Sequence, residues 1–90
     1  MTPNTVPSTR LDTRWRKYRG KVFIARGDNA FELSEVAAFI YKSIDGSRTI
    51  RQLGEGLAAE YDIAVEDAVS DIEELLTDLV AADVIDIRDL

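Results

Sequence analysis

The residue types that most often carry catalysis are missing from this chain. Its 90 residues include no histidine and no cysteine. Histidine is the commonest general base and the commonest metal ligand near neutral pH, and cysteine supplies nucleophiles, disulfides and thiolate metal sites. The reactive groups that remain are carboxylates, serines and lysines. Most hydrolase mechanisms and most zinc sites are therefore disfavoured.

The carboxylates form no catalytic or metal-binding pattern. The chain has 17 Asp and Glu residues, and all but Asp12 lie after residue 26. Several flank a helical stripe in residues 65–82, where solvation of a helix surface is the ordinary explanation. The D-x-D-x-D-G spacing of a calcium loop is absent, and Gly54-Glu55-Gly56 lacks the Lys-Ser/Thr that completes a phosphate loop. Composition leaves a Ser-Lys pair open, but we predict a non-enzyme without a cofactor or a metal.

Charge is distributed unevenly along the chain. Residues 1–26 carry seven basic side chains against one acid, and the net charge of the whole chain is −6. An acidic body repels phosphates and favours a basic peptide or protein partner, although solvated helix surfaces explain the same acids equally well. The predicted second helix offers Arg51 and Gln52 to DNA, and the third offers no basic side chain, so we expect no nucleic-acid partner.

The length fits one domain. A chain of 90 residues buries only about 60–65% of the surface that its unfolded form exposes. No apolar run approaches the roughly 20 residues of a membrane span, and the first residues lack the features of a signal peptide. We therefore expect a cytoplasmic protein without a membrane partner. Residues 1–10, which hold both prolines, predict a flexible tail before a domain over residues 11–90.

Three strand-like runs precede three helical runs. The strands are predicted over residues 13–18, with Trp15 facing inward, and over residues 22–25 and 29–33, with turns between them. Ser34 is a good N-cap for a helix over residues 35–44. Thr49 and Gln52 form a capping box for a second helix.

Further signals follow the capping box. Gly54 and Gly56 weaken the second helix by about 1 kcal/mol each relative to Ala, which a close helix contact would explain. The third helix is predicted over residues 65–82, and a short strand over residues 84–87. The predicted fold class is α+β, winged helix-turn-helix-like, with a three-stranded antiparallel sheet followed by three helices.

The third strand lies at the edge of such a sheet. In Asn29-Ala30-Phe31-Glu32-Leu33, Phe31 and Leu33 point to one side and Ala30 and Glu32 to the other, which is the alternation of a half-buried strand. An edge strand leaves backbone donors and acceptors unpaired on one side, so we expect a peptide to add there as a fourth strand. The apolar stripe of the third helix is wider than packing on two short helices needs. Either the core uses all of it or part of it lines a groove beside the edge.

With this order of elements, the chain resembles the PqqD-type proteins, which are recognition elements for ribosomally made precursor peptides (RiPP recognition elements, RREs). No single motif is specific, but the ordered set covers about residues 11–87. The matching segments are Arg14-Trp15-Arg16, Phe31-Glu32-Leu33-Ser34, Val36-Ala37-Ala38-Phe39-Ile40, Asp45-Gly46-Ser47-Arg48-Thr49-Ile50, residues 57–61, and Asp71-Ile72-Glu73-Glu74-Leu75-Leu76.

The resemblance implies a non-catalytic module that captures the leader segment of a precursor peptide. In this family the leader pairs with the third strand and packs against the third helix. For Phe31, Leu33, Ile72 and Leu76, burial in the core is the competing interpretation. Carried onto this sequence, the implied peptide-binding residues are Ala30, Phe31, Glu32, Leu33, Asp67, Asp71, Ile72, Leu75, Leu76 and Leu79.

Two subgroups of the family are similar to a free-standing chain of this size. One presents a precursor to a radical-SAM enzyme in the biosynthesis of the quinone cofactor PQQ. The other serves lasso peptides and passes the leader to a cysteine-protease subunit, before a cyclase closes the ring. Tyr61-Asp62-Ile63 and the acidic last helix favour the lasso group. A winged-helix nucleic-acid-binding domain and a dimerisation domain that uses the same edge are the alternatives from other classes.

Overall fold

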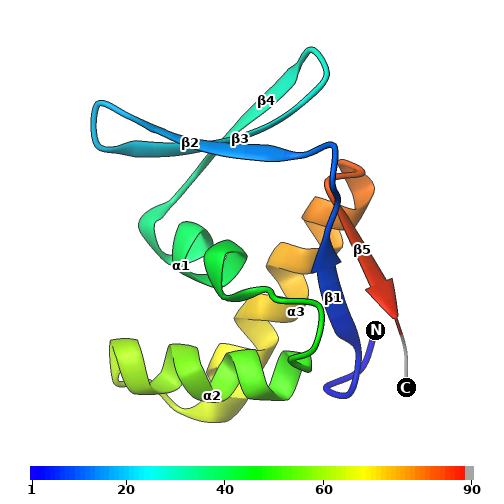
Figure 1. Cartoon of the computed structure of the whole chain (residues 1–90). Helices are drawn as coiled ribbons and strands as arrows, with labels where there is room; N and C mark the ends of the chain where they lie inside the picture. Colours follow the sequence, from blue (N-terminus) through cyan, green and yellow to red (C-terminus); the bar gives the residue numbers. More distant parts are fainter. Residues whose placement is uncertain (89–90) are drawn as a thin grey trace.

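The computed structural model of the chain describes residues 1–88 and has an α+β fold (Figure 1). Residues 89–90, the end of the predicted domain, lie outside the described residues. As predicted, three antiparallel strands precede three helices, and two further short strands form a second sheet. The elements are β1 (Val6–Thr9), β2 (Arg14–Tyr18), β3 (Lys21–Arg26), β4 (Asn29–Leu33), α1 (Glu35–Ser43), α2 (Ile50–Tyr61), α3 (Val65–Ala81) and β5 (Ile85–Arg88).

Two tight hairpins build the three-stranded sheet in the order β2-β3-β4. Arg19 and Gly20, with φ of 52° and 78°, connect β2 to β3, and positive φ at both positions is the requirement of a type I′ turn. Gly27 begins the turn from β3 to β4 with a φ of 58°, a left-handed conformation that glycine adopts without steric cost. The sheet sits above the helices, with β4 leading directly into α1 (Figure 1).

The predicted helix starts are confirmed by their caps. The Ser34 hydroxyl accepts a hydrogen bond from the Ala37 N–H at 3.1 Å, which begins α1. At α2 the Gln52 N–H donates to the Thr49 hydroxyl at 3.1 Å and the Thr49 N–H donates to Gln52 Oε1 at 2.9 Å, the reciprocal pattern of a capping box. These local bonds fix where the chain turns from the sheet into the helices.

A close contact between α2 and α3 explains one of the two helical glycines. A Cβ atom at Gly54 would lie 2.6 Å from Val69 Cγ2 and 3.3 Å from the Val69 backbone nitrogen. Gly54 therefore lets the two helices approach, a contact that the sequence alone did not show. Gly56 has open space around it, so packing does not explain that residue.

The N-terminal residues belong to the folded domain, and the expectation of a flexible tail over residues 1–10 is corrected. β1 pairs antiparallel with β5, and Val6 is 2% exposed. The Arg51 and Ile50 N–H groups donate to the carbonyls of Pro3 and Thr5 at 3.0 and 2.9 Å. These bonds satisfy donors that the first turn of α2 leaves without an intrahelical partner, so the tail caps a helix as well as pairing with β5.

Trp15 lies on the inward face of the sheet but is half exposed. It is opposite Ile24, which in turn is opposite Phe31, and residues opposite one another share a face. Ile24 is fully buried, whereas Trp15 on the edge strand is 47% exposed. The Lys42 ammonium lies 4.4 Å from the centre of its ring, a cation–π contact. The predicted inward direction of Trp15 is therefore confirmed, although the side chain is only half buried.

Candidate functional site

The outer edge of β4 is open in the part of the chain that the structure describes. β4 pairs with β3 only, and the strand that the N-terminus adds pairs with β5 in a separate sheet. The turn between β3 and β4 has two residues, so the pair that flanks it, Arg26 and Asn29, is a hydrogen-bonded pair of the two strands. Because bonded and non-bonded pairs alternate, the backbone groups of Ala30 and Glu32 are directed at the open edge. A peptide strand can pair with these groups.

A groove of about 260 Å³ begins where β4 ends, and we call it the α1–α3 groove. Its apolar surface comes from α1 and from Leu75, which packs partly buried against the core. Its other side is acidic and belongs to α3. The residues that line it are Ser34, Val36, Ala37, Ile40, Asp71, Glu74, Leu75 and Asp78.

The three carboxylates of the groove have no cationic partner within residues 1–88. Asp71, Glu74 and Asp78 lie at the i, i+3 and i+7 positions of one face of α3, where side chains gather on the same side. The ion pairs that the described residues form all lie elsewhere. Uncompensated carboxylates beside an apolar surface attract Lys or Arg side chains of a ligand. No group of three or more acids among residues 1–88 is arranged to hold a metal ion.

The structure divides the predicted residues of α3 into two groups. Asp71 and Leu75 line the groove, whereas Asp67 is exposed but does not line it. Ile72, Leu76 and Leu79 are 0%, 0% and 5% exposed, so they cannot contact a peptide without unfolding of the core. For these three residues the prediction is corrected: the core uses the main stripe of α3, and only its flank remains open.

The predicted residues of β4 behave differently from one another. Ala30 and Glu32 are exposed on the outer face of the sheet. Phe31, on the inward face, is 37% exposed, and Leu33 is 8% exposed. Leu33 is therefore a core residue, and its backbone groups face Val22 of β3 rather than the open edge.

Sequence reasoning did not place six of the groove residues in the site: Ser34, Val36, Ala37, Ile40, Glu74 and Asp78. Among the residues that α1 contributes, Ile40 is 3% exposed and Val36 is 39% exposed. A usable signal was the spacing of Asp71, Glu74, Leu75 and Asp78, which places all four on one face of α3.

A larger cavity of about 550 Å³ lies on the other side of Ser34, beneath the β2–β3 turn. Its lining includes both lysines and glutamates, and one ion pair joins Lys21 Nζ to Glu32 Oε1 at 3.7 Å. Burial, followed by the charges of Glu35 and Glu60, raises the pKa of Tyr61 at its lower side. We place the candidate site in the smaller α1–α3 groove, because the charged residues that line it are all carboxylates and lie beside an apolar surface, whereas lysines and glutamates are mixed in the larger cavity.

Known proteins share this architecture and sequence pattern. A PqqA binding protein of Xanthomonas oryzae pv. oryzae is 28% identical over an alignment of 81 residues, and the alignment covers 88% of each chain. A second PqqA binding protein, from another strain, is 29% identical over 75 residues, or 81% of this chain and 82% of the relative. Neither alignment leaves out much of either protein, so the likeness extends over the whole domain.

Two solved structures are similar to this fold. The first is the solution NMR structure of the PqqD truncation of Methylobacterium extorquens PqqCD, described as a functional, stand-alone RiPP recognition element. It has a TM-score of 0.80 and 26% identity, over 90% of this chain and 88% of that one. The crystal structure of PqqD from Xanthomonas campestris matches with a TM-score of 0.60 and 24% identity over 92% and 94% of the two chains, and shows the fold alone.

The family model described as "Coenzyme PQQ synthesis protein D (PqqD)" matches residues 21–85. This segment runs from the first residue of β3 to the first residue of β5 and contains the open edge and all of α1, α2 and α3. The chain therefore belongs to the PqqD family.

Proposed function

We propose that this protein binds the leader segment of a ribosomally made precursor peptide and presents it to a modifying enzyme, without catalysing a reaction itself. The leader adds as a strand to the open edge of β4, and its side chains enter the α1–α3 groove. The observation that carries the proposal is the continuity of the two features, since the groove begins at Ser34, directly after β4. The named properties of two relatives, PqqA binding and RiPP recognition, support the same function.

Backbone pairing alone does not give useful affinity. An added strand makes about four to six main-chain hydrogen bonds, each worth about 0.5–1.5 kcal/mol net. Association costs about 4–15 kcal/mol, before a flexible leader is ordered. Apolar leader side chains must supply the difference, at about 25 cal/mol per Å² buried. Because the groove measures about 260 Å³, less than the roughly 300–1,000 Å³ of small-molecule sites, it suits side-chain anchors rather than a whole small molecule.

The carboxylates of α3 define the chemistry beside those anchors. Asp71, Glu74 and Asp78 are on the rim of the groove, so the favoured leader has Lys or Arg next to its apolar anchors. Each exposed acid–lysine pair adds less than about 1 kcal/mol. These pairs therefore orient the strand and speed its encounter more than they tighten the complex.

The pathway has two candidates. The names of the curated relatives favour PqqA as the precursor, and the protein would then serve a radical-SAM enzyme in PQQ biosynthesis. Tyr61-Asp62-Ile63 and the acidic α3 favour a lasso precursor, with a cysteine-protease leader peptidase and a cyclase as the partners.

Calorimetry with synthetic peptides tests the function and separates the pathways. The titrants are PqqA and the leader of the precursor encoded beside this chain, each with a scrambled version as the control. We expect one native sequence to bind with 1:1 stoichiometry and its scrambled version not to bind. A dimer that forms at increasing protein concentration, with no binding of either peptide, would assign the β4 edge to a second copy of the chain and contradict the proposal.

A further inference from the structure

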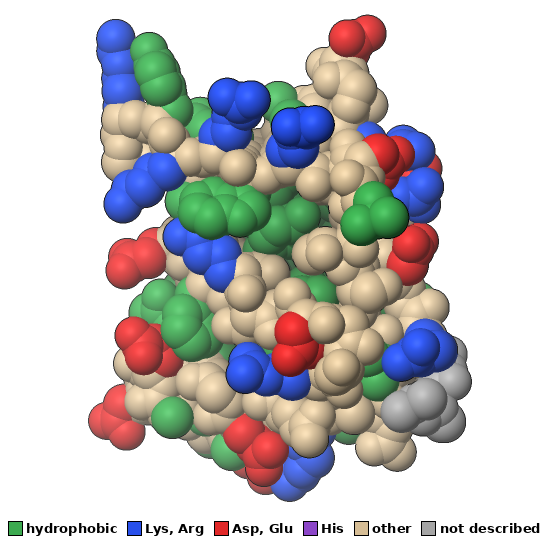
Figure 2. Space-filling view, viewed as in Figure 1, with side chains coloured by type: hydrophobic (Ala, Val, Ile, Leu, Met, Phe, Trp, Pro, Cys, Tyr) green, Lys and Arg blue, Asp and Glu red, His purple; other side chains and the backbone are tan. Residues whose placement is uncertain are grey.

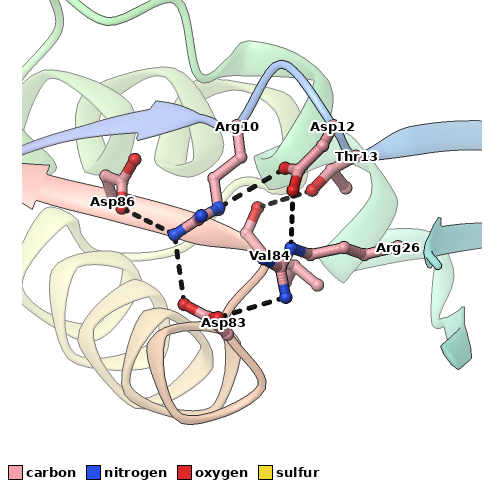
Figure 3. Close-up of polar contacts among 7 residues, drawn as sticks. All are labelled: Arg10, Asp12, Thr13, Arg26, Asp83, Val84 and Asp86. Carbon is pink, nitrogen blue, oxygen red and sulfur yellow. Dashed lines mark hydrogen bonds and ion pairs between the residues drawn. The ribbon is translucent and has the colours of Figure 1, made fainter.

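Five charged side chains form a connected cluster on the side of the molecule where the two sheets meet (Figure 3). Arg26 Nε lies 2.9 Å from Asp12 Oδ2, and Arg26 Nη1 lies 3.1 Å from Asp83 Oδ2. Arg10 Nη1 lies 3.1 Å from Asp83 Oδ1 and 3.3 Å from Asp86 Oδ1, and Arg10 Nε lies 3.4 Å from Asp12 Oδ1. We call these five residues the ion cluster.

The ion cluster joins segments that are far apart in the sequence. Arg10 and Asp12 lie between β1 and β2, and Arg26 is the last residue of β3. Asp83 follows α3, and Asp86 belongs to β5. Close by, the Thr13 hydroxyl donates to the Val84 carbonyl at 3.5 Å. The cluster therefore ties the β3–β4 hairpin to the carboxyl end of α3.

The strand β4 is consequently held at both ends. At its Leu33 end the chain continues into α1 through the Ser34 cap. At its Asn29 end, Asn29 pairs with Arg26, whose guanidinium is held by Asp12 and Asp83. A hairpin attached at one end only would pivot about Ser34, and the open edge would move relative to α3.

The pKa shifts of Asp12 and Arg10 have the directions expected for charges that are paired within the cluster. Desolvation acts to raise the pKa of Asp12, but the hydrogen bonds and charges of Arg26 and Arg10 outweigh it and lower that pKa. The charge of Asp83, followed by those of Asp86 and Asp12, raises the pKa of Arg10 against a desolvation effect. The side chains are between 28% and 62% exposed, so their contribution to global stability is small. Their main effect is on geometry.

We infer that the ion cluster is a positioning device, in which Arg26 and Asp83 fix the open edge of β4 over the α1–α3 groove before the leader binds. The inference rests on the proposed function and names the residues that set its affinity without touching the peptide. A preformed site spends less of its binding free energy on ordering the protein. Loosening the cluster therefore weakens leader binding although the groove itself is unchanged.

A double-mutant cycle tests this role. Arg26→Met keeps the apolar stem of the side chain, and Asp83→Asn keeps a residue that tolerates its positive φ of 64°. We expect each variant to bind the leader about three- to tenfold more weakly, and the double variant to lose less than the product of the two losses. Hydrogen exchange of the Asn29, Phe31 and Leu33 amides, which face β3, should become faster in the free variants. The matched control is Arg48→Met, which removes an exposed pair with Asp45 (3.4 Å) outside the groove, and should change neither quantity.

The outcomes separate this inference from the proposed function. If the wild type binds the leader and both single variants bind it equally well, the positioning role is refuted while leader binding stands. If the wild type binds no leader, the proposed function fails. The exchange rates of β4 then decide on their own whether the cluster holds the hairpin, and unchanged rates overturn that claim.

Discussion

The three-stranded sheet has two open edges, β2 and β4, and they differ in what lies beside them. All five residues of β2 are exposed, and three of them are basic: Arg14, Arg16 and Lys17. Lys and Arg on an edge strand repel a second copy of the same edge. The edge of β4 instead leads into an apolar groove with carboxylates on its rim. We therefore expect a peptide to add to the β4 edge rather than to the β2 edge, because only β4 has side chains beside it that suit a ligand with apolar and basic residues.

Charge reinforces the difference between the two edges. On the face drawn in Figure 2, Lys and Arg side chains gather around the three-stranded sheet, while Asp and Glu are spread over the helices below it. A leader with Lys or Arg beside its anchors is repelled by β2 and attracted by α3. We therefore expect charge to direct the peptide to β4.

Replacing the apolar residue that α3 contributes to the groove should weaken leader binding most. Leu75→Arg replaces an apolar anchor surface with a charge and removes about 2–3 kcal/mol of burial, which corresponds to roughly 30- to 150-fold weaker leader binding by calorimetry. Thermal unfolding should remain cooperative, because Leu75 is only partly buried. Ile63→Arg is the matched control, since Ile63 is 38% exposed and does not line the groove. Equal losses in both variants would mean that the groove is misplaced.

Proline substitution compares the two edges directly. Glu32→Pro removes a backbone N–H directed at the open edge of β4 while leaving the ladder to β3 intact, and should weaken leader binding about tenfold by calorimetry. Lys17→Pro makes the equivalent change on β2 and should leave binding unchanged. Glu32→Ala controls for the lost carboxylate, which forms only an exposed pair with Lys21. If Lys17→Pro proves the more damaging variant, the roles of the two edges are reversed.

A smaller effect is expected from the rim of the groove. Asp71→Asn should weaken leader binding about threefold at low salt, because an exposed ion pair is worth less than about 1 kcal/mol. The slope of affinity against salt should also become shallower. Asp67→Asn, one turn earlier on α3 and outside the groove, should change affinity less. Equal effects of the two variants would show that the acids act through net charge alone.

The smallest effect is expected when Asp12 of the ion cluster loses its charge. The pKa of Asp12 is lower in the folded protein than its ordinary value of 3.8. Its stabilising contribution is therefore complete above that value and disappears as the pH falls through the folded pKa. Amide exchange at acidic pH, corrected for its intrinsic pH dependence, should show opening of Asn29–Leu33 in the wild type. The Asp12→Asn variant should show the same opening already at neutral pH, and a variant with closed β4 amides would contradict this.

Local signals made much of the fold predictable. The caps at Ser34 and Thr49 depend on residues within three positions of one another, and both are present as predicted. The pairing of β1 with β5 was not predictable in this way, because the two strands come from opposite ends of the chain and β1 contains Pro7.

The site was predictable in part for a similar reason. Alternation along residues 29–33 predicted the edge strand. Periodicity also gave the apolar stripe of α3, but not which of its residues the core would bury, so Ile72 and Leu76 were placed in the site although both are fully buried. The contacts between Arg26 and Asp83 join distant segments, and no local pattern indicates them.

The most direct test is an NMR titration of the ¹⁵N-labelled protein with the leader peptide that binds in calorimetry. We expect the amide signals of Asn29–Leu33, Asp71 and Leu75 to shift and saturate together at a 1:1 ratio, while those of Arg14–Tyr18 stay in place. Shifts confined to Arg14–Tyr18, with β4 and α3 unchanged, would contradict this expectation.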